Sequence, residues 1–196
     1  MTPATDIPEP KFIGYFAMLA MKQPDWLKAL QVEEICSASD CIGRTDWDWI
    51  NEWRHNAAWV FDSPELAWSV VPQQLRESCD IYAFCLFPVR YELGSRASAA
   101  IPDVKPVPMD SSFTKLGYDL VSSTTGNCFE HSPLSCNGLA AEVPTNRYCL
   151  LDTAEEAFAL APTLEVPGQP MRGEPGPYHI VEVWRQRRIL KRPPGV

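Results

Sequence analysis

The chain has 196 residues, of which 45% are hydrophobic and 21% are charged. This composition is typical of a globular protein and excludes the low-hydrophobicity, high-charge class of disordered chains. The length suits one domain of ordinary size, so we expect a single domain over residues 1–192 and a flexible tail at residues 193–196.

The formal net charge of −8 is unevenly distributed along the chain. Five cations lie among the last twelve residues, where there is no acid: Arg185, Arg187, Arg188, Lys191 and Arg192. The rest of the chain therefore carries −8 less these five positive charges, or −13. An acidic body repels phosphate backbones, which disfavours nucleic acid as a partner.

The longest apolar segment near the start, residues 12–21, is too short to span a bilayer and follows acidic rather than basic residues. We therefore expect a soluble protein without membrane association or an export signal. The seven cysteines are an odd number, and without a signal peptide they are expected to be reduced. These observations predict a cytoplasmic protein with buried thiols.

In chain order, residues 12–17 predict a short buried strand, and Pro24 predicts the start of a helix through Leu30. A second strand is expected at residues 35–38. Thr45 and Asp48 resemble a capping signal, which predicts a helix continuing to residue 60. A further short helix is expected to begin at Ser63 and Pro64 and to end before Pro72.

Residues 80–89 are almost wholly apolar, which predicts a central strand covered on both faces. Residues 94–112 are rich in Gly, Ser and Pro and predict a long surface connection. Beyond it we expect three strands and one helix. The strands are expected at residues 118–122, 147–151 and 178–184, and the helix is expected to be capped by Asp152 and Glu155.

The predicted helices and strands alternate without a regular period, and we find no internal repeat in the sequence. The fold class that this order predicts is α+β: a single compact domain with a mixed, largely antiparallel sheet and three to four helices.

The densest chemical cluster runs from residue 128 to 149 and reads CFEHSPLSCNGLAAEVPTNRYC. Thiolate and imidazole are zinc ligands, so a zinc site is one hypothesis for this segment. Its ligands would be Cys128, His131, Cys136 and Cys149. The intervals differ from the two close pairs usual in structural zinc sites, so buried free cysteines are the preferred interpretation and no cofactor is favoured.

A second hypothesis makes Cys128 a nucleophile with His179 as its base. Residues 126–129, GNCF, followed by His179 late in the chain, resemble the nucleophile turn of papain-like and ovarian-tumour-type cysteine hydrolases. That resemblance implies a hydrolase that uses a cysteine thiol as its nucleophile. Those families begin a long helix at the cysteine, whereas Pro133 follows here within five residues.

Glu182 is the third candidate, because period-two alternation places its carboxylate between Ile180 and Trp184 on a largely apolar face. The alternative is an ion pair with Arg147 or Arg90. The order of strands, with a serine-containing segment at residues 37–39, is similar to small ADP-ribosyltransferase folds, which implies that Glu182 stabilises a ribosyl cation. The Arg or His that this family carries on its first strand is missing from residues 12–17.

Five of the seven tryptophans lie between residues 47 and 68, together with His55. Helical spacing favours a packing role for several of them, while His55 remains a candidate site residue.

Two classes of function follow. The preferred one is a protein-interaction or regulatory module, immunity-like or adaptor-like, with a protein partner. The alternative is a small enzyme whose polar pocket takes a nucleotide-like ligand, with Glu182 and His55 catalytic. The ligand-binding residues of that pocket would be Glu130, Ser132, Ser135, Asn137 and Asn146.

Overall fold

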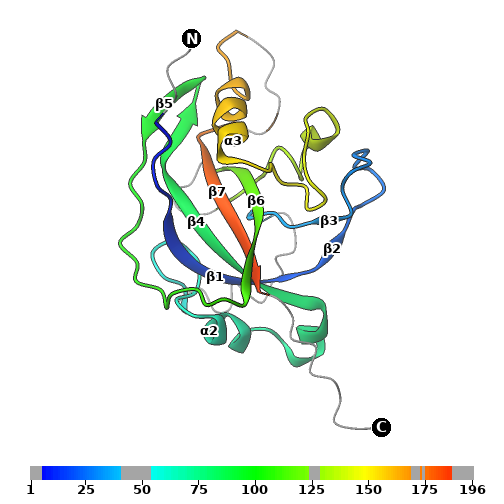
Figure 1. Cartoon of the computed structure of the whole chain (residues 1–196), viewed down its shortest axis with the longest axis vertical. Coiled ribbons are helices and arrows are strands. Elements are labelled where there is room, and N and C mark those ends of the chain that lie inside the picture. The colour runs from blue at the N-terminus through cyan, green and yellow to red at the C-terminus, as the bar shows by residue number, and fades with distance from the viewer. Residues whose placement is uncertain (1–5, 41–53, 124–128, 169–172, 174, 187–196) are drawn as a thin grey trace.

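The computed structural model describes residues 6–40, 54–123, 129–168, 173 and 175–186. They form one compact body around a five-stranded antiparallel sheet, with few helices (Figure 1). The expected α+β class with a largely antiparallel sheet is therefore confirmed. The strands that lie side by side are, in order, β1 Lys11–Leu19, β4 Cys79–Glu92, β7 Tyr178–Gln186 and β6 Phe113–Ser122.

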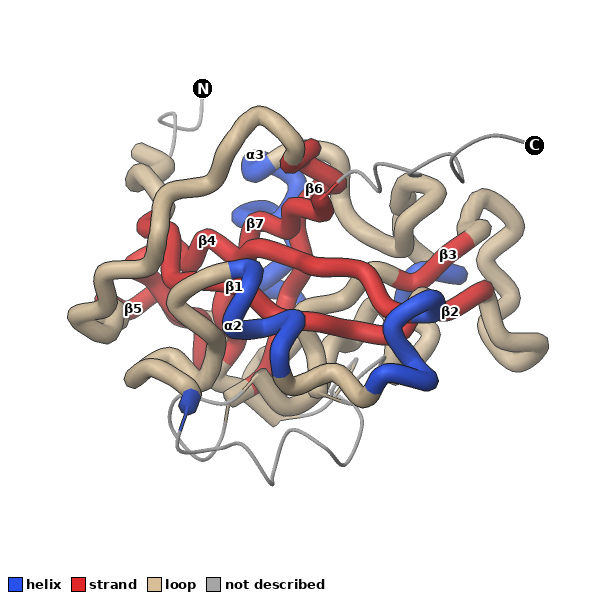
Figure 2. The backbone as a smooth tube through the Cα atoms, turned by 90° about the horizontal axis from the view of Figure 1, so that it is seen from below, coloured by secondary structure: helices blue, strands red, loops and turns tan. Residues whose placement is uncertain are grey.

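Strand β5, Ser95–Ser98, pairs with the second half of β4, within the segment that was expected to be a plain connection. The chain then arches over one side of the sheet before it enters β6 (Figure 2). A separate two-stranded ribbon is formed by β2, Met21–Lys22, and β3, Glu34–Ile35.

Two α-helices lie at opposite ends of the sheet in Figure 1. Helix α2, Pro64–Ser69, begins as expected at Ser63, whose Oγ accepts a hydrogen bond from the Leu66 amide. Helix α3, Ala154–Leu160, begins at Thr153, which forms a capping box with Glu156. This corrects the expected cap at Asp152 and Glu155 by one residue. Three 3₁₀ turns complete the described helices: η2 Gln73–Ser78, η3 Leu139–Ala141 and η4 Ala161–Thr163.

The two halves of the sheet are related by an internal two-fold axis, which the sequence did not lead us to expect. Every register pair between β1 and β4 has a counterpart between β6 and β7. Near the axis the matched pairs are Gly14 with Phe84 and Gly117 with Val183, then Tyr15 with Ala83 and Tyr118 with Glu182. Phe84 and Val183 also pair with each other, so the axis passes between β4 and β7.

The same repeat extends beyond the strands into a turn that precedes each helix. Asn56 and Asn146 occupy equivalent places, and each side-chain amide donates to a backbone carbonyl of the edge strand, at 3.0 Å to Ile13 and 2.8 Å to Leu116. In sequence the two copies read NAAWVFDSPELAW, from residue 56, and NRYCLLDTAEEAF, from residue 146. The structure therefore contains an internal repeat, although the two copies share few identical residues.

A glycine in each edge strand makes this turn possible. Gly14 and Gly117 have φ angles of +139° and +148°, and each lies at a register shift of its strand. A Cβ atom would lie 2.5 Å from the carbonyl oxygen of Phe61 or of Leu151, respectively. Only glycine fits both the backbone angle and the close approach of the turn.

Each half also has an insertion between its edge strand and its turn. Residues 33–36 of the first insertion pair with the turn of the second half: the amides of Glu33 and Glu34 donate to the Arg147 carbonyl, and the Cys36 amide donates to that of Tyr148. The ribbon formed by β2 and β3 thus lies in the first half of the sequence but packs against the second half of the structure.

Three further expectations fail. Residues 23–33 form turns rather than a helix, and residues 54–61 form a turn and a bridge to Tyr15; the start of that predicted helix lies outside the described residues. Of the strand expected at residues 147–151, only an isolated bridge between Leu151 and Tyr118 exists. Each segment packs as a connection around the sheet.

Candidate functional site

An open groove lies where β4 begins and β7 ends, and it has a volume of about 680 Å³. Its walls come from distant parts of the chain: the end of β1, the β2–β3 ribbon, the turn before α3, the start of β6 and the end of β7. The lining residues are Ala20, Glu34, Asp80, Thr114, Leu116, Tyr148, Arg185 and Gln186. Most of them are polar or charged, which distinguishes the groove from the apolar core.

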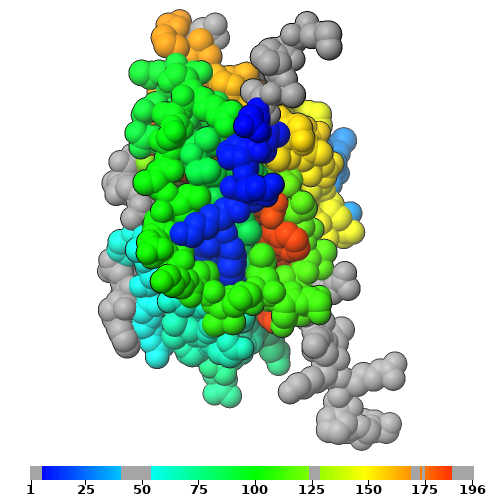
Figure 3. Space-filling view, turned by 60° about the vertical axis from the view of Figure 1, so that its left-hand side comes forward, coloured from blue at the N-terminus to red at the C-terminus, as the bar shows by residue number. Residues whose placement is uncertain are grey.

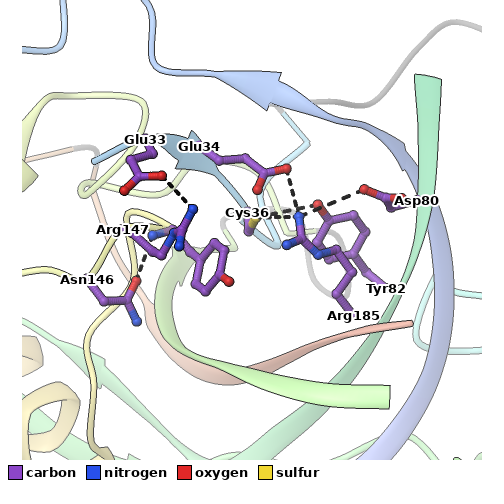
Figure 4. A network of polar contacts seen from close by, with 9 residues as sticks. Glu33, Glu34, Cys36, Asp80, Tyr82, Asn146, Arg147 and Arg185 are labelled. Carbon is purple, nitrogen blue, oxygen red and sulfur yellow. Dashed lines mark hydrogen bonds and ion pairs between the residues drawn. The ribbon is translucent and has the colours of Figure 1, made fainter. Parts of the chain in front are cut away.

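Arg185 lies at the centre of this groove (Figure 4). Its Nη1 atom is 2.7 Å from Oε1 of Glu34 and 3.8 Å from Oδ2 of Asp80. Burial is the largest influence on Arg185 and opposes its charge, but the hydrogen bond to Glu34 and the electrostatic effect of the surrounding ionisable groups together outweigh it, and the pKa of the guanidinium lies above its ordinary value. The arginine therefore remains a fixed cation between two carboxylates.

Cys36 lies behind Arg185, 3.7 Å from its Nη1 atom, and accepts a hydrogen bond of 3.5 Å from the Tyr82 hydroxyl. Burial raises the pKa of the Cys36 thiol to about 12, so it stays neutral. A neutral thiol is a poor nucleophile. Cys36 thus serves as a packing residue with weak polar contacts.

The rim of the groove carries an aromatic ring held by two cations. The guanidinium carbons of Arg147 and Arg185 lie 5.5 Å and 5.2 Å from the centroid of the Tyr148 ring. Arg147 also forms an ion pair of 2.5 Å with Glu33. Among the described residues, three carboxylates and two guanidinium groups therefore meet at this end of the sheet.

The internal two-fold axis relates this groove to a second one at the opposite end of the sheet. That second groove is nearly filled, with a volume of only about 20 Å³. It is lined by Ala58, Leu86, Ala100, Pro102, Ser123, Phe129 and His179. Register and turn geometry match Ala20 with Ser123, Asp80 with His179, Tyr148 with Ala58 and Arg185 with Leu86.

The closed groove is therefore apolar where the open groove is charged. Its histidine, His179, has a pKa lowered to about 4, chiefly by burial and also by the nearby Arg90. Among the described residues, Nδ1 of His179 has no hydrogen-bond partner. His179 is thus a neutral packing residue at physiological pH.

Two of the expected pocket residues, Ser132 and Ser135, are fully buried inside the fold. Ser132 donates a hydrogen bond of 2.6 Å to Oδ1 of Asp119, and Ser37 donates one of 2.6 Å to Oδ2. Backbone amides of Ala38 and Leu120 complete the shell of this carboxylate. Burial raises the pKa of Asp119. Its four hydrogen-bond donors belong to the fold itself, so Asp119 is a structural carboxylate. This residue was not among those singled out from the sequence.

The remaining pocket candidates are dispersed. Asn146 supports the turn described above, and the Glu130 carbonyl accepts a hydrogen bond of 2.9 Å from Ser39. Asn137 is exposed, just before the 3₁₀ turn η3.

Glu182 is buried in the sheet, on the opposite face from Arg185 and His179 because the strand alternates. Its Oε1 atom accepts a hydrogen bond from Nε1 of Trp184, and its Oε2 atom lies 3.7 Å from Nζ of Lys115. The partner is therefore a lysine rather than Arg147 or Arg90. In Figure 3, part of β7 (red) reaches the surface beside the N-terminal segment (blue).

The other catalytic candidate, His55, packs among aromatic rings. Its ring centroid lies 4.4 Å from that of Phe61 and 6.0 Å from that of Phe16. Phe16 is on the sheet face opposite Glu182, so the structure does not bring the two predicted catalytic residues together. Cys128 lies outside the described residues.

Within the parts of the chain that the structure describes, no three His, Cys, Asp or Glu side chains are grouped so as to hold a metal ion. His131, Cys136 and Cys149 are among the residues searched, while Cys128 is not. The same parts contain no helix of the length and apolarity needed to cross a membrane.

The residues that make the open groove were not among those expected from the sequence. Glu34, Asp80, Tyr148 and Arg185 stand far apart in the chain and match no motif. The one signal that could have found them is the duplication, because aligning the halves places Arg185 against Leu86 and Asp80 against His179.

Comparison with known proteins gives no relative for this fold. No family model, no curated protein and no solved structure matches the chain.

Proposed function

We propose that this protein is a regulatory protein-interaction module, of an immunity-like or adaptor-like kind, and that its partner binds in the open groove. The observation that carries the proposal is the difference between the two symmetry-related grooves. The shared strand register and turn lead to a groove filled by apolar side chains at one end and to an open groove around partly buried charges at the other. Open, charged cavities reduce stability. A groove of this kind that is retained despite that cost is therefore expected to have a binding function.

The surroundings of the groove favour a protein partner. The segment between β2 and β3 carries Trp26 and Leu30, which are 52% and 100% exposed, and this segment projects from the body in Figure 1. Exposed tryptophan beside charged residues is typical of an interface anchor. The same ribbon supplies Glu34 to the groove, so an apolar contact and a polar contact are available to one partner.

The groove offers less to the enzyme hypothesis. The Cys36 thiol behind it is neutral, and its arginine already binds two carboxylates. A nucleotide-like ligand would bring its phosphates close to the carboxylates of Glu34 and Asp80. These features favour recognition of a protein surface over catalysis on such a ligand.

The experiment is affinity capture with cross-linking from an extract of the cells that make the protein. Glu34→Arg and Trp26→Ala should each reduce the yield of the specific partner at least about tenfold, the loss expected when a central contact is removed. Leu93→Ala, which removes another exposed apolar side chain away from the groove, should leave capture unchanged. Equal capture by all four proteins would exclude the groove as the binding site.

A further inference from the structure

A separate cluster of polar and aromatic side chains lies where β6 pairs with β7, on the face of the sheet opposite Arg185. Lys115 lies opposite Trp184 in the strand register. Close by, Tyr118 lies opposite Glu182. A register shift after Lys115 inserts one extra residue in β6, so Lys115 and Tyr118 share one face although they are three residues apart. The bulge therefore brings the four side chains together.

The ammonium group of Lys115 is held by two rings and a carboxylate. Its Nζ atom is 5.2 Å from the centroid of the Tyr118 ring and 5.9 Å from that of the Trp184 ring. The same atom donates a hydrogen bond of 3.0 Å to the Tyr118 hydroxyl and lies 3.7 Å from Oε2 of Glu182. Aromatic rings are groups with which proteins bind ammonium ligands. We call Tyr118, Glu182 and Trp184 the ammonium cage.

The cage is fixed in the sheet, whereas its present occupant can leave. Nε1 of Trp184 donates a hydrogen bond to Oε1 of Glu182, which orients the indole ring. The side chain of Glu182 is 11% exposed and that of Lys115 is 44% exposed. A half-exposed ion pair contributes little to stability, so Lys115 can swing into solvent at small cost. A second ammonium group could then take its place.

The first half of the chain shows that the fold does not require this cage. The two-fold axis places Phe12 where the second half has Lys115, and Ala83 where it has Glu182. Phe12 packs edge to face against Tyr15, with ring centroids 5.1 Å apart. Apolar side chains thus satisfy the equivalent positions. Burying a carboxylate is costly by comparison, which favours a binding role for Glu182.

We propose that the ammonium cage binds a methylated lysine side chain of another protein, whose ammonium group replaces that of Lys115 beside Glu182. The cage already holds a lysine side chain, which favours a ligand of the same length and charge. Methylation keeps the positive charge, and a methylated ammonium group suits a site built from aromatic rings. The cage lies on the other face of the sheet from the open groove, so this inference goes beyond the proposed function and does not depend on it.

The test is an NMR titration of the full-length protein with the N-acetyl amide of trimethyllysine, followed through the indole Nε1–H resonance of Trp184. The probe should shift this resonance saturably, with a dissociation constant of about 1 mM for a single side chain. Its neutral analogue, in which carbon replaces the charged nitrogen, should bind at least about fivefold more weakly. The ring resonances of Tyr148 in the open groove should not move, which gives an internal control.

Lys115→Ala tests the exchange directly. Because it removes a tethered competitor, it should tighten binding of the trimethyllysine probe about tenfold. Lys22→Ala removes an exposed lysine of β2 and should leave binding unchanged. Glu182→Gln should weaken binding at least about fivefold, because the carboxylate is lost. If these variants do not fold, the wild-type ranking of the probe and its neutral analogue still decides.

Other results would overturn the inference. If up to about 10 mM probe causes no saturable shift of Trp184 in the wild type or in Lys115→Ala, the cluster serves only the sheet. Equal binding of the neutral analogue would show that the charge is not recognised. Tighter binding of phosphocholine would assign the cage to a choline group instead of a lysine side chain. None of these results changes the expected outcome of partner capture at the open groove.

Discussion

At one end of the sheet Leu86, Phe129 and His179 fill the groove; at the other, Glu34, Tyr148 and Arg185 surround an open one. The two ends share strand register, the glycine bulge, the asparagine turn and the helix cap. The difference comes from side chains at equivalent positions, such as Leu86 against Arg185, and from the connection before β6, which supplies Ala100 and Pro102 to the closed groove. The comparison teaches that the fold itself does not require the charged groove.

The largest expected effect tests what the halves share. Gly14→Ala and Gly117→Ala should each lower the free energy of unfolding by about 3 kcal/mol or more, because the new Cβ meets a carbonyl oxygen and the φ angle is unfavourable. Urea denaturation measures both. Gly168→Ala is the control, since Gly168 has a φ of +77° but no atom within 4 Å of an added Cβ, so only its backbone strain of about 1 kcal/mol should appear. Unequal losses at Gly14 and Gly117 would break the structural equivalence.

The next effect tests how the halves differ. Phe129 is 4% exposed in the closed groove, so Phe129→Ala should cost about 3 kcal/mol through lost packing and a new cavity. Tyr148→Ala, in the half-buried wall of the open groove, should cost only about 1 kcal/mol. Chemical denaturation of the two variants gives the comparison directly. A larger loss for Tyr148 would mean that the open groove is built for stability after all.

The third effect appears in the pH dependence of stability. Because the folded-state pKa of His179 is lowered to about 4 from 6.5, the unfolded chain binds a proton more readily than the folded one between these values. Stability should therefore fall as the pH drops from about 6.5 to about 4, by about 2 to 3 kcal/mol from this residue.

His179→Leu should remove that part of the slope while fitting the apolar lining. Other groups titrate in the same range, so the measured quantity is the difference between the two proteins in urea midpoints across pH. An identical pH profile for wild type and variant would show that His179 is not buried neutral in the closed groove.

The strands could be predicted because their residues carry the signal locally. Residues 80–89 are almost wholly apolar, and β4 lies inside the sheet with strands on both sides. The helix expected after Pro24 failed for a tertiary reason. There the Gln23 side chain donates to the carbonyls of Leu27 and Ala29, at 2.6 Å and 2.8 Å, and holds the segment in turns. Apolar spacing alone could not reveal that contact.

The candidate site could not be predicted because its parts become neighbours only through the sheet register and the two-fold axis. The cluster at residues 128–149 drew attention for its chemistry, yet Ser132 there completes the hydrogen bonds of Asp119. Asp119 itself stands where the first half has Phe16. Ser132, a polar residue in this dense cluster, thus stabilises a buried carboxylate instead of lining a binding site.

Because the first insertion packs against the second half of the structure, the open groove depends on both halves of the chain. Glu34 and Cys36 come from the first half of the chain, but their segment is hydrogen-bonded to the turn at Arg147 and Tyr148 in the second. Neither half alone contains a complete groove. A substitution at Glu34, in the first half of the chain, therefore alters the same surface as a substitution at Tyr148 or Arg185 in the second.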